Sequence, residues 1–516
     1  MSRPLPRILT ALVAALTLVL TACGAGGNPA GDGTGNDEKT LRFVTVYPPN
    51  TTDAHMINAA FVLNSGTVEM LMGIDPETLD AYPWLAESYE TEDAQHWSFT
   101  IREGISFHNG NPLNAEAVRA SLQNAIDVNP GVATALKIQE MEVVDEYTLN
   151  ITTESVYPAL ISNLIHQNAV IVDVTDEGDL PIGTGPFKFE SFDPNTEAVL
   201  VRNDEYWDGR AKLDKVIMAS NEDANARMLA IQAGDADVIY RPSTESIETL
   251  SQDPNITVES VPGNRVYHLL FNFAGQNAEL WNNIEFRKGI DALMDRQAIV
   301  DGVMAGEGTV AYNPFPGEWP FSPAPLEHAT GTDAALSHFE AAGLEVNNGM
   351  VTRDGQPLTL TAGTYIARPE LPLIAQLLRD SAAKVGITVD IQVADNIDEY
   401  AATGNFDLLT YSMLTITRGD GSFYLNGTFD AGGAQNHGHL EDPTLTGMLE
   451  EFNTELDADV RNEKAKEIAA YLEEQAIHSY LVVPNESSAY SNRVTGWTTP
   501  VNEFEFPMIT KDLDIE

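Results

Sequence analysis

The sequence predicts an α/β protein with at least two lobes, and three observations support this prediction. The chain has 516 residues, which is too many for one small hydrophobic core. Hydrophobic residues make up 43% of it, as is typical of a globular protein. Beyond residue 265, helical and strand-like segments alternate along the sequence. This order indicates a second α/β lobe that follows the first.

The charge balance limits the classes of partner that the protein can bind. Acidic residues outnumber lysine and arginine by 77 to 28, which gives a net charge of −49. A body this acidic is repelled by phosphate backbones and by anionic lipid head groups, so we exclude nucleic-acid binding. In such a protein, a basic residue that lines a cleft needs a specific role.

The chain opens with the pattern of an export signal. Arg3 and Arg7 precede an apolar run of roughly 15 residues, shorter than the about 20 that a membrane span needs. The only cysteine, Cys23, follows Leu-Thr-Ala, and this pattern resembles the lipobox of bacterial lipoproteins, in which the thiol carries a diacylglycerol. We expect a lipoprotein signal at residues 1–22, lipid attachment at Cys23 and a flexible tether at residues 23–39. The alternative is a plain signal peptide with an incidental cysteine.

The first half of the chain shows strand and helix patterns in a definite order. The stretch KTLRFVTV predicts a strand, and residues 53–74 predict a helical stretch. Trp97, Phe99 and Ile101 alternate with polar residues, which is the period of a half-buried strand. Asn114 is a suitable N-cap for the helix that follows.

A hairpin and two further strands are predicted before the middle of the chain. Residues 141–153 predict the hairpin, and two more strand patterns are marked by Phe187 and Phe189 and by Val199 and Val201. The segment Gly183-Thr184-Gly185-Pro186 lacks the Gly-Lys-Ser/Thr end of a phosphate loop and precedes a strand. We interpret it as a turn in which glycine supplies an unusual φ.

The later elements alternate between the two types. In order, they are a helix and a strand over 225–240, a helix over 286–304, a strand over 358–363, a helix over 369–386, a strand over 388–394, a helix over 459–478 and a strand over 479–484. The sequence contains no solenoid-type repeats.

Six segments together carry a family resemblance. In order, they are YPWLAESYE, HWSFTIREGISFHNGNPLNAEAV, PIGTGPFKFESF, VRNDEYWDGRAKLDKVIM, MLAIQAGDADV and FRKGIDALMDRQAIVDGVMAGEG. They resemble the landmarks of the peptide/nickel-type solute-binding proteins of ABC importers, solute-binding protein family five. The resemblance covers nearly all of the chain beyond Cys23.

The resemblance implies a periplasmic-binding-protein-like α/β fold of type II, cluster C, with two lobes hinged around a ligand cleft. It implies lobe I at residues 40–265 and 490–516, with an inserted subdomain at about 56–180, and lobe II at 266–489. It also implies delivery of a solute to an ABC permease driven by cytoplasmic ATPases. We expect a monomer without a cofactor, held by its lipid anchor at the outer face of the cell membrane.

The resemblance also points to candidate ligand residues. Peptide binders of the family use an aspartate in lobe II to pair with the α-ammonium group of the peptide. In the matching stretch, YSMLTITRGDGSF, Thr417 stands where the aspartate would be, followed by Arg418 and Asp420. An arginine beside the cleft suits a carboxylate, which it can grip with two hydrogen bonds. Two alternatives stay open: Arg418 pairs with a local acid such as Asp420, or Asp420 receives an amine of the ligand.

Histidine and tyrosine residues extend the list of candidates. Tyr365 and Tyr411 are possible aromatic walls of the cleft. Four histidines are weak candidates for direct metal ligation or ligand contact: His55, His166, His437 and His439. If nickel is carried, we expect it inside a chelator, with at most one histidine of the protein as a ligand.

Three classes of function follow from these observations. The first is an ABC-importer solute-binding protein for a short peptide or similar polar solute, with a nickel or metal-chelate carrier of the same family as the alternative. The second is a signalling receptor that presents a bound peptide to another membrane protein. The third is an exported hydrolase, which the sequence disfavours because the GxSxG and HExxH motifs are missing from it. We therefore do not expect an enzyme.

Overall fold

A computed structural model describes residues 38–56, 59–76 and 78–516. The predicted signal, Cys23 and nearly all of the predicted tether lie outside the described residues. No helix in the described part of the chain is long and apolar enough to cross a membrane.

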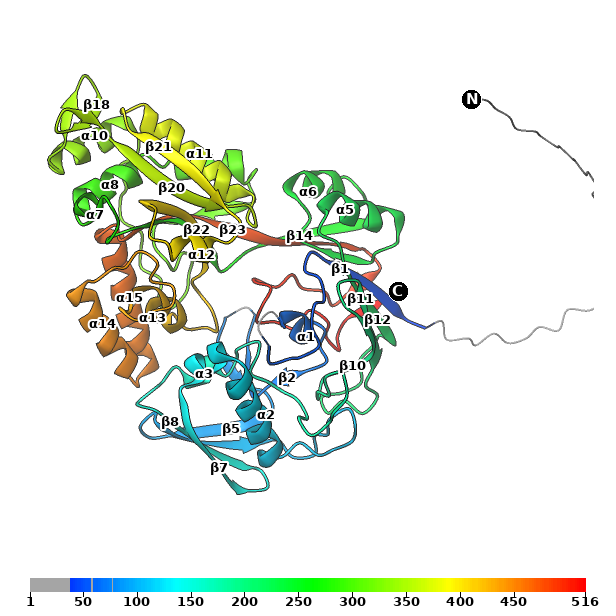
Figure 1. Cartoon of the computed structure of the whole chain (residues 1–516). Helices are drawn as coiled ribbons and strands as arrows, with labels where there is room; N and C mark the ends of the chain where they lie inside the picture. Colours follow the sequence, from blue (N-terminus) through cyan, green and yellow to red (C-terminus); the bar gives the residue numbers. More distant parts are fainter. Residues whose placement is uncertain (1–37, 57–58, 77) are drawn as a thin grey trace, which may run out of the picture. The chain divides into compact units, whose positions relative to one another are not determined.

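The longest run of paired strands follows the order β10-β11-β12-β1-β13-β23-β15-β22-β20-β21, and β14 and β16 also pair with β23. These strands are β1 (Thr40–Thr45), β10 (Phe187–Asp193), β11 (Glu197–Arg202), β12 (Lys215–Ser220), β13 (Val238–Tyr240), β14 (Ile256–Pro262), β15 (Arg265–Phe271), β16 (Gly308–Val310), β20 (Thr359–Tyr365), β21 (Thr388–Ala394), β22 (Leu408–Leu414) and β23 (His478–Ser491). Figure 1 shows β23, in orange-red, passing from the β20–β22 strands toward β14.

Strand β23 links two groups of strands. Up to Pro484 it pairs with β15 and β16, and from Asn485 it pairs with β13 and β14. The chain passes between the same two groups a second time at residues 263–264, between β14 and β15. We call the group with β1 and β10–β14 lobe I, and the group with β15, β16 and β20–β22 lobe II. We propose that the lobe boundary lies at these two crossings, so that the second one falls near Pro484, a few residues before the predicted 489.

Helices accompany the strands of both lobes. Lobe I has α5 (Ala224–Ala233) and α6 (Thr244–Leu250), with the short pair β24 (Val494–Thr495) and β25 (Asp514–Ile515). Lobe II has α7 (Ala278–Trp281), α8 (Ile284–Ala292), α9 (Arg296–Ala298), the π-helical turn η1 (Ile299–Val303), α10 (Thr332–Ala341), α11 (Glu370–Ala383), α12 (Ile397–Ala401), α13 (Ser422–Phe429), α14 (Pro443–Thr454) and α15 (Ala458–Glu474). A small sheet, β17 (Glu345–Asn347), β18 (Met350–Arg353) and β19 (Gln356–Pro357), follows α10.

A separate four-stranded sheet lies in the region of the predicted subdomain. Its strands pair in the order β5 (Ala86–Thr91), β6 (His96–Ile101), β8 (Thr148–Thr153) and β7 (Ile138–Asp145). Around it are α1 (Ala60–Asn64), α2 (Ala115–Val128), α3 (Pro130–Leu136), α4 (Leu160–Asn163) and the short strands β2 (Glu69–Met70), β3 (Met72–Ile74), β4 (Ala81–Pro83) and β9 (Val170–Ile171). The domain limits of this region stay a proposal.

The predicted alternation in β6 is confirmed. Trp97, Phe99 and Ile101 are all at most 5% exposed, because one face of the sheet packs against α2. The helix begins where predicted, since the Asn114 side chain accepts a hydrogen bond from the Ala117 backbone N–H at 3.0 Å.

Two predicted helices differ from the structure. In residues 53–74, the described helix is only α1, and strands β2 and β3 follow it. The predicted helix over 286–304 is interrupted after α8, and a new turn begins where the Asp295 side chain accepts a hydrogen bond from Ala298 N at 3.0 Å. A side-chain cap in the middle of an apolar pattern therefore decided the break.

The predicted turn at residues 183–186 is correct, but its predicted reason is wrong. Neither Gly183 nor Gly185 has a positive φ. A Cβ at Gly183 would lie 2.2 Å from Thr67 O, and one at Gly185 would lie 2.3 Å from Gly66 O. The glycines are required because two backbone segments approach each other closely, which a side chain would prevent.

Candidate functional site

The turn at residues 417–420 presents Arg418 from lobe II, just after β22. Arg418 and Gly419 both have positive φ, 57° and 66°, and the Asp420 N–H donates to Thr417 O at 3.1 Å. Two consecutive residues of this kind define a tight turn of the I′ type. A Cβ at Gly419 would lie 1.7 Å from Leu79 O. The lobe II turn thus packs directly on the backbone of the N-terminal region.

Arg418 is buried and makes contacts outside lobe II. It is 7% exposed, and its Nη1 donates to Asn163 Oδ1 of α4 at 2.6 Å. Its Nε lies 3.6 Å from the carboxylate of Glu505, in the C-terminal segment. The guanidinium also lies over the Phe423 ring, 4.9 Å from the centroid. One lobe II arginine therefore contacts two segments that are distant in sequence.

The Arg418 guanidinium has hydrogen-bonding capacity to spare. Its Nε has no hydrogen-bond partner within residues 38–56, 59–76 and 78–516, and 3.6 Å is too long for a hydrogen bond with Glu505. Burial lowers the pKa of Arg418, and the Glu505 charge only partly opposes this. A buried cation with an unpaired N–H group is costly, and a carboxylate is the acceptor that matches its fork geometry.

The other predicted residues of this turn have different environments. Asp420 forms an ion pair with Arg461 at 3.1 Å, not with Arg418. It also accepts from Ser422 N at 2.5 Å, at the start of α13. Thr417 is 2% exposed, and its hydroxyl has no hydrogen-bond partner. Of the three residues predicted here, Arg418 and Thr417 each have a polar atom without a hydrogen-bond partner among the described residues. The Asp420 carboxylate already pairs with Arg461 and Ser422 N.

A second group of arginines surrounds Glu503, two residues before Glu505. The same carboxylate oxygen of Glu503 lies 2.9 Å from Arg368, 3.2 Å from Arg265 and 3.7 Å from Arg241. Burial opposes ionisation of Glu503, but the three guanidinium groups outweigh it and hold the pKa of this carboxyl well below its usual range. These arginines come from both lobes, because Arg241 follows β13 and Arg368 follows β20.

Sequence reasoning missed this arginine group. Its acidic partners are Glu503 and Glu486, which lies 3.4 Å from Arg241. Three cations against two anions leave one positive charge in excess in a chain of net charge −49. A signal was available: Arg241 and Arg368 each stand directly before a proline, just after a strand.

The predicted aromatic residues lie together in lobe II. The rings of Tyr365 and Tyr411 are 6.3 Å apart. The Tyr411 hydroxyl donates to Asp398 at 2.5 Å and lies 3.2 Å from His437 Nε2. The neighbouring residue in β22, Ser412, accepts from Arg265 at 3.1 Å. The tyrosine pair is therefore connected to the arginine group through β22.

The remaining histidine candidates are dispersed. His55 is 1% exposed, with one ring nitrogen 3.0 Å from Val170 O and the other 2.8 Å from the Asn124 amide. His166 is half-buried, and burial followed by the Arg418 charge lowers its pKa well below its usual value. His439 is exposed. Among the described residues, no group of three or more His, Cys, Asp and Glu side chains is arranged to hold a metal ion.

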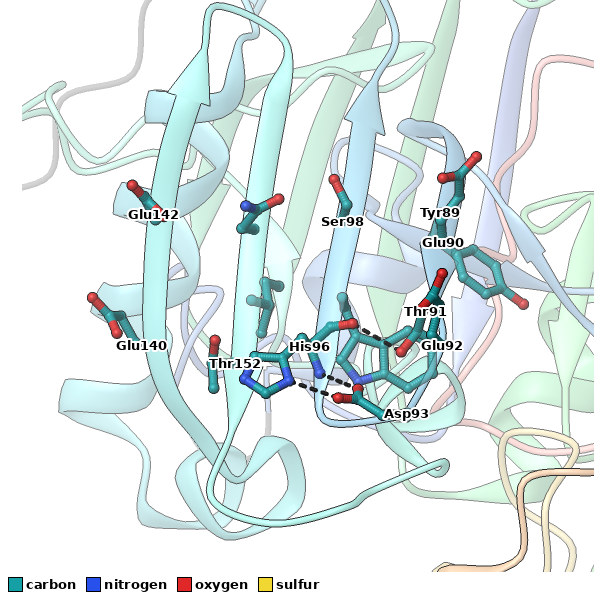
Figure 2. A pocket seen from close by; sticks show the side chains of 13 residues that line it. Tyr89, Glu90, Thr91, Glu92, Asp93, His96, Ser98, Glu140, Glu142 and Thr152 are labelled. Atoms are coloured by element: carbon teal, nitrogen blue, oxygen red, sulfur yellow. Dashed lines mark hydrogen bonds and ion pairs between the residues drawn. The ribbon is translucent and has the colours of Figure 1, made fainter.

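A hollow of about 880 Å³ lies on the open face of the β5–β6–β8–β7 sheet (Figure 2). Its acidic lining includes Glu90, Glu140 and Glu142, and at one end His96 Nδ1 lies 2.8 Å from Asp93. Lysine and arginine are missing from the described residues that line it, and so is every residue of lobe II. It therefore lacks both the cations and the two-lobe origin that distinguish the region of Arg418.

Two lobes joined by two crossings, with buried and half-buried arginines from both lobes at the boundary, define a two-lobed solute-binding protein. The family model for bacterial extracellular solute-binding proteins, family 5 Middle, matches residues 80–436. This is more than half of the chain, and the chain belongs to that family. Its members are extracytoplasmic solute-binding proteins of ABC importers.

Individual relatives span nearly the whole chain. A solved structure described as the nickel ABC transporter from Bacillus halodurans is 42% identical and covers 93% of this chain and 100% of that one, with a TM-score of 0.81. The structure of NikA from Staphylococcus aureus in complex with Ni(L-His)2 is 25% identical, with coverage of 93% and 100% and a TM-score of 0.77. Di/tripeptide-binding protein 1 of Pseudomonas aeruginosa is 25% identical over 461 residues, 80% of this chain and 83% of that protein.

Proposed function

We propose that the protein captures a small solute with carboxylate groups between its lobes and delivers it to an ABC permease. One observation carries this proposal: the Nε N–H of the buried Arg418 guanidinium has no acceptor among the described residues, at the point where the lobe II turn meets Asn163 and Glu505. A ligand that contacts both lobes favours the form in which they are closed together. The closed form then docks on the permease, and the protein carries out no covalent chemistry.

We propose a nickel chelate as the first ligand class. The structure that is 42% identical is described as a nickel ABC transporter, and another relative, 25% identical, was solved with Ni(L-His)2, whose two histidine ligands each carry a carboxylate. Arginines rather than clustered histidines fit a metal that arrives already chelated, because the protein then binds the chelator. Tyr365, Tyr411 and His437 are in contact with one another, and Ser412, next to Tyr411 in β22, accepts from Arg265 of the arginine group, so we include the three as ligand contacts in this proposal.

A short peptide is the second ligand class, and one observation favours it. A peptide carries an ammonium group as well as a carboxylate, and Glu505 lies 3.6 Å from Arg418. The two side chains offer opposite charges to the two ends of a small zwitterion. The predicted amine partner Asp420 is less suitable, because Arg461 already pairs with it.

Substitution of Arg418 tests the carboxylate proposal. We expect Arg418→Ala to weaken binding of Ni(L-His)2 by about 1.5–3 kcal/mol, as for a lost charge-assisted hydrogen bond. Arg418→Lys should recover only part of this, because an ammonium cannot make the two-pronged contact. Isothermal titration measures both, with the exposed Arg379→Ala on α11 as a control. A dissociation constant unchanged by Arg418→Ala would remove this residue from the site.

We also propose that Cys23 carries a lipid anchor and that the protein acts as a monomer at the outer face of the membrane. The support is the sequence alone: a basic start, a short apolar run and a single cysteine at its end. Two or more acyl chains hold a protein stably, whereas one holds it only marginally. We expect Cys23→Ser to move the protein from the membrane fraction to the soluble fraction. Full retention in the membrane fraction would contradict the anchor.

A further inference from the structure

The C-terminal segment at residues 501–506 places two carboxylates among the boundary arginines. Glu503 and Glu505 are 1% and 3% exposed, and they belong to a stretch without regular secondary structure. The segment is attached to the N-terminal region, since Asn64 of α1 donates to the carbonyl oxygen atoms of Glu503 and Phe506 at 3.3 and 2.8 Å. Lobe II meets it with Arg368 and Arg418.

The two glutamates are held very differently. Glu503 receives three arginines on one oxygen, so its position in the segment is fixed by ion pairs from both lobes. Glu505 has one arginine, Arg418, at 3.6 Å, and that guanidinium makes no hydrogen bond to it. The Glu505 carboxylate instead accepts from Asn502 Nδ2 at 3.0 Å and, at 3.4 Å, from the Arg418 backbone N–H.

The charges of Arg418 and Glu505 do not fully compensate each other. Burial raises the pKa of Glu505, and the nearby Arg418 opposes this only in part. Burial likewise lowers the pKa of Arg418 despite Glu505. A loose, desolvated ion pair gains less from Coulomb attraction than it loses in hydration. A better-placed carboxylate would therefore bind Arg418 more strongly than Glu505 does.

We propose that Glu505 is an affinity- and specificity-determining residue that competes with the carboxylate of the ligand for Arg418. This inference rests on the proposed function, namely that Arg418 binds a carboxylate of the solute. In the ligand-free protein, Glu505 partly neutralises the buried guanidinium. When the solute enters, its carboxylate accepts a hydrogen bond from the unpaired Nε of Arg418. The negative charge of Glu505 repels this carboxylate and weakens its binding. Glu503 holds the segment in place, so only the Glu505 side chain has to adjust.

Competition of this kind selects among ligands. A monocarboxylate that contacts only Arg418 binds weakly, because the Glu505 carboxylate beside Arg418 repels its negative charge. A solute that contacts further groups at the boundary, or that carries a metal cation beside its carboxylates, is repelled less by Glu505. The residue thus disfavours simple organic acids without any steric exclusion.

The test is a titration of the full chain with two probes, Ni(L-His)2 and citrate. Relative to the unsubstituted protein, we expect Glu505→Gln to lower the dissociation constant for citrate by about tenfold and that for Ni(L-His)2 by less. Glu505→Asp retains the charge but withdraws it from Arg418 by one methylene, so we expect a smaller gain. The exposed Glu450→Gln on α14 makes the same change in net charge and should leave both constants unaltered.

The outcomes separate this inference from the proposed function. If Arg418→Ala weakens binding but Glu505→Gln leaves it unchanged, Glu505 is not a competitor. If Glu505→Gln weakens binding, Glu505 contacts a cationic group of the ligand, which also overturns the competition. If neither probe binds to the unsubstituted protein or to Glu505→Gln, both proposals fail together. Circular dichroism of each variant shows whether it is folded, and Glu505→Asp replaces Glu505→Gln if the latter is not.

Discussion

At the residue scale, two arginines at the boundary between the lobes have strained backbone conformations. Arg241 and Arg418 both have positive φ, 54° and 57°, which is uncommon for residues other than glycine. Such conformations persist only where the surroundings enforce them, and they are often found at functional sites. Here the enforcing contacts are the ion pairs of Arg241 with two glutamates and the packing of the Arg418 turn on Leu79. The strain therefore lies at Arg418, which we assign to ligand binding, and at Arg241 of the neighbouring arginine group.

Another residue-scale feature is the buried histidine pair behind the tyrosine wall. His268 of β15 and His478 of β23 stack with ring centroids 4.9 Å apart, with Tyr411 and Tyr480 beside His268. Burial lowers the pKa of His268 to about 4, and burial lowers that of His478 well below its usual value. Both rings are therefore neutral in the folded protein at neutral pH.

We predict that this pair makes the fold acid-sensitive. A histidine in the unfolded chain has a pKa near 6.5. Between pH 6.5 and pH 4 the unfolded state therefore binds a proton that the folded state does not, and the free energy of unfolding decreases as the pH is lowered. For His268 alone, the loss should reach about 3 kcal/mol at pH 4. Urea unfolding at pH 7 and pH 4.5 measures it, and His268→Gln should show a smaller difference between the two values. Equal pH dependence in both proteins would contradict the prediction.

At the element scale, close backbone contact rather than side-chain packing fixes one connection of lobe I. The turn before β10 lies against residues 66–68, where a Cβ at either Gly183 or Gly185 would overlap backbone oxygen atoms. Thr184, between these glycines, donates to the buried Glu69 of β2 at 2.6 Å. The turn and the N-terminal strands are therefore joined by both contact and hydrogen bonding.

We predict that Gly183→Ala destabilises the protein by about 3 kcal/mol, because the added methyl group must displace backbone. Gly447→Ala on α14 is the matched control. The space around Gly447 is open, and alanine is the better helix former, so we expect stabilisation by about 0.5–1 kcal/mol. Chemical denaturation of both variants gives the two values. A Gly183→Ala protein as stable as the unsubstituted chain would show that the contact relaxes without cost.

At the scale of the whole molecule, the described residues cross between the two strand groups twice, at residues 263–264 and near Pro484. Two crossings allow rigid-body closure, and ligands bound between lobes stabilise the closed form. The ion pairs of Arg368 and Arg418 with the C-terminal segment are the contacts that such a motion would break and re-form. The acidic charge of the chain favours ligands that bring a cation or that meet these arginines directly.

We predict that a bound solute both compacts and stabilises the protein. Small-angle scattering should show a smaller radius of gyration with Ni(L-His)2 than without it. At a free ligand concentration of 100 times the dissociation constant, the free energy of unfolding should rise by about 2.7 kcal/mol. An Arg418→Ala protein at the same concentration should show less of both effects. Stabilisation without any compaction would contradict a closure mechanism.

Much of the fold was accessible from local patterns in the sequence. The strand with Trp97, Phe99 and Ile101, the Asn114 cap and the alternating elements beyond residue 265 are confirmed, because each depends on side-chain periodicity or on one capping residue. The helical stretch over 53–74 was predicted wrongly, since apolar residues there serve short buried strands that periodicity cannot distinguish from a helix. The predicted roles of Arg418, Thr417, Tyr365 and Tyr411 stay predictions.

The sequence by itself determined the class of the protein, its charge and the Asn114 cap, because family motifs, composition and capping residues are local properties of the chain. Only the tertiary structure decided what Arg418 contacts. Its partners Asn163 and Glu505 lie 255 and 87 residues away along the chain, and the arginine group around Glu503 is likewise assembled from distant positions. Their pairing depends on burial and on distances between lobes, which no local pattern records.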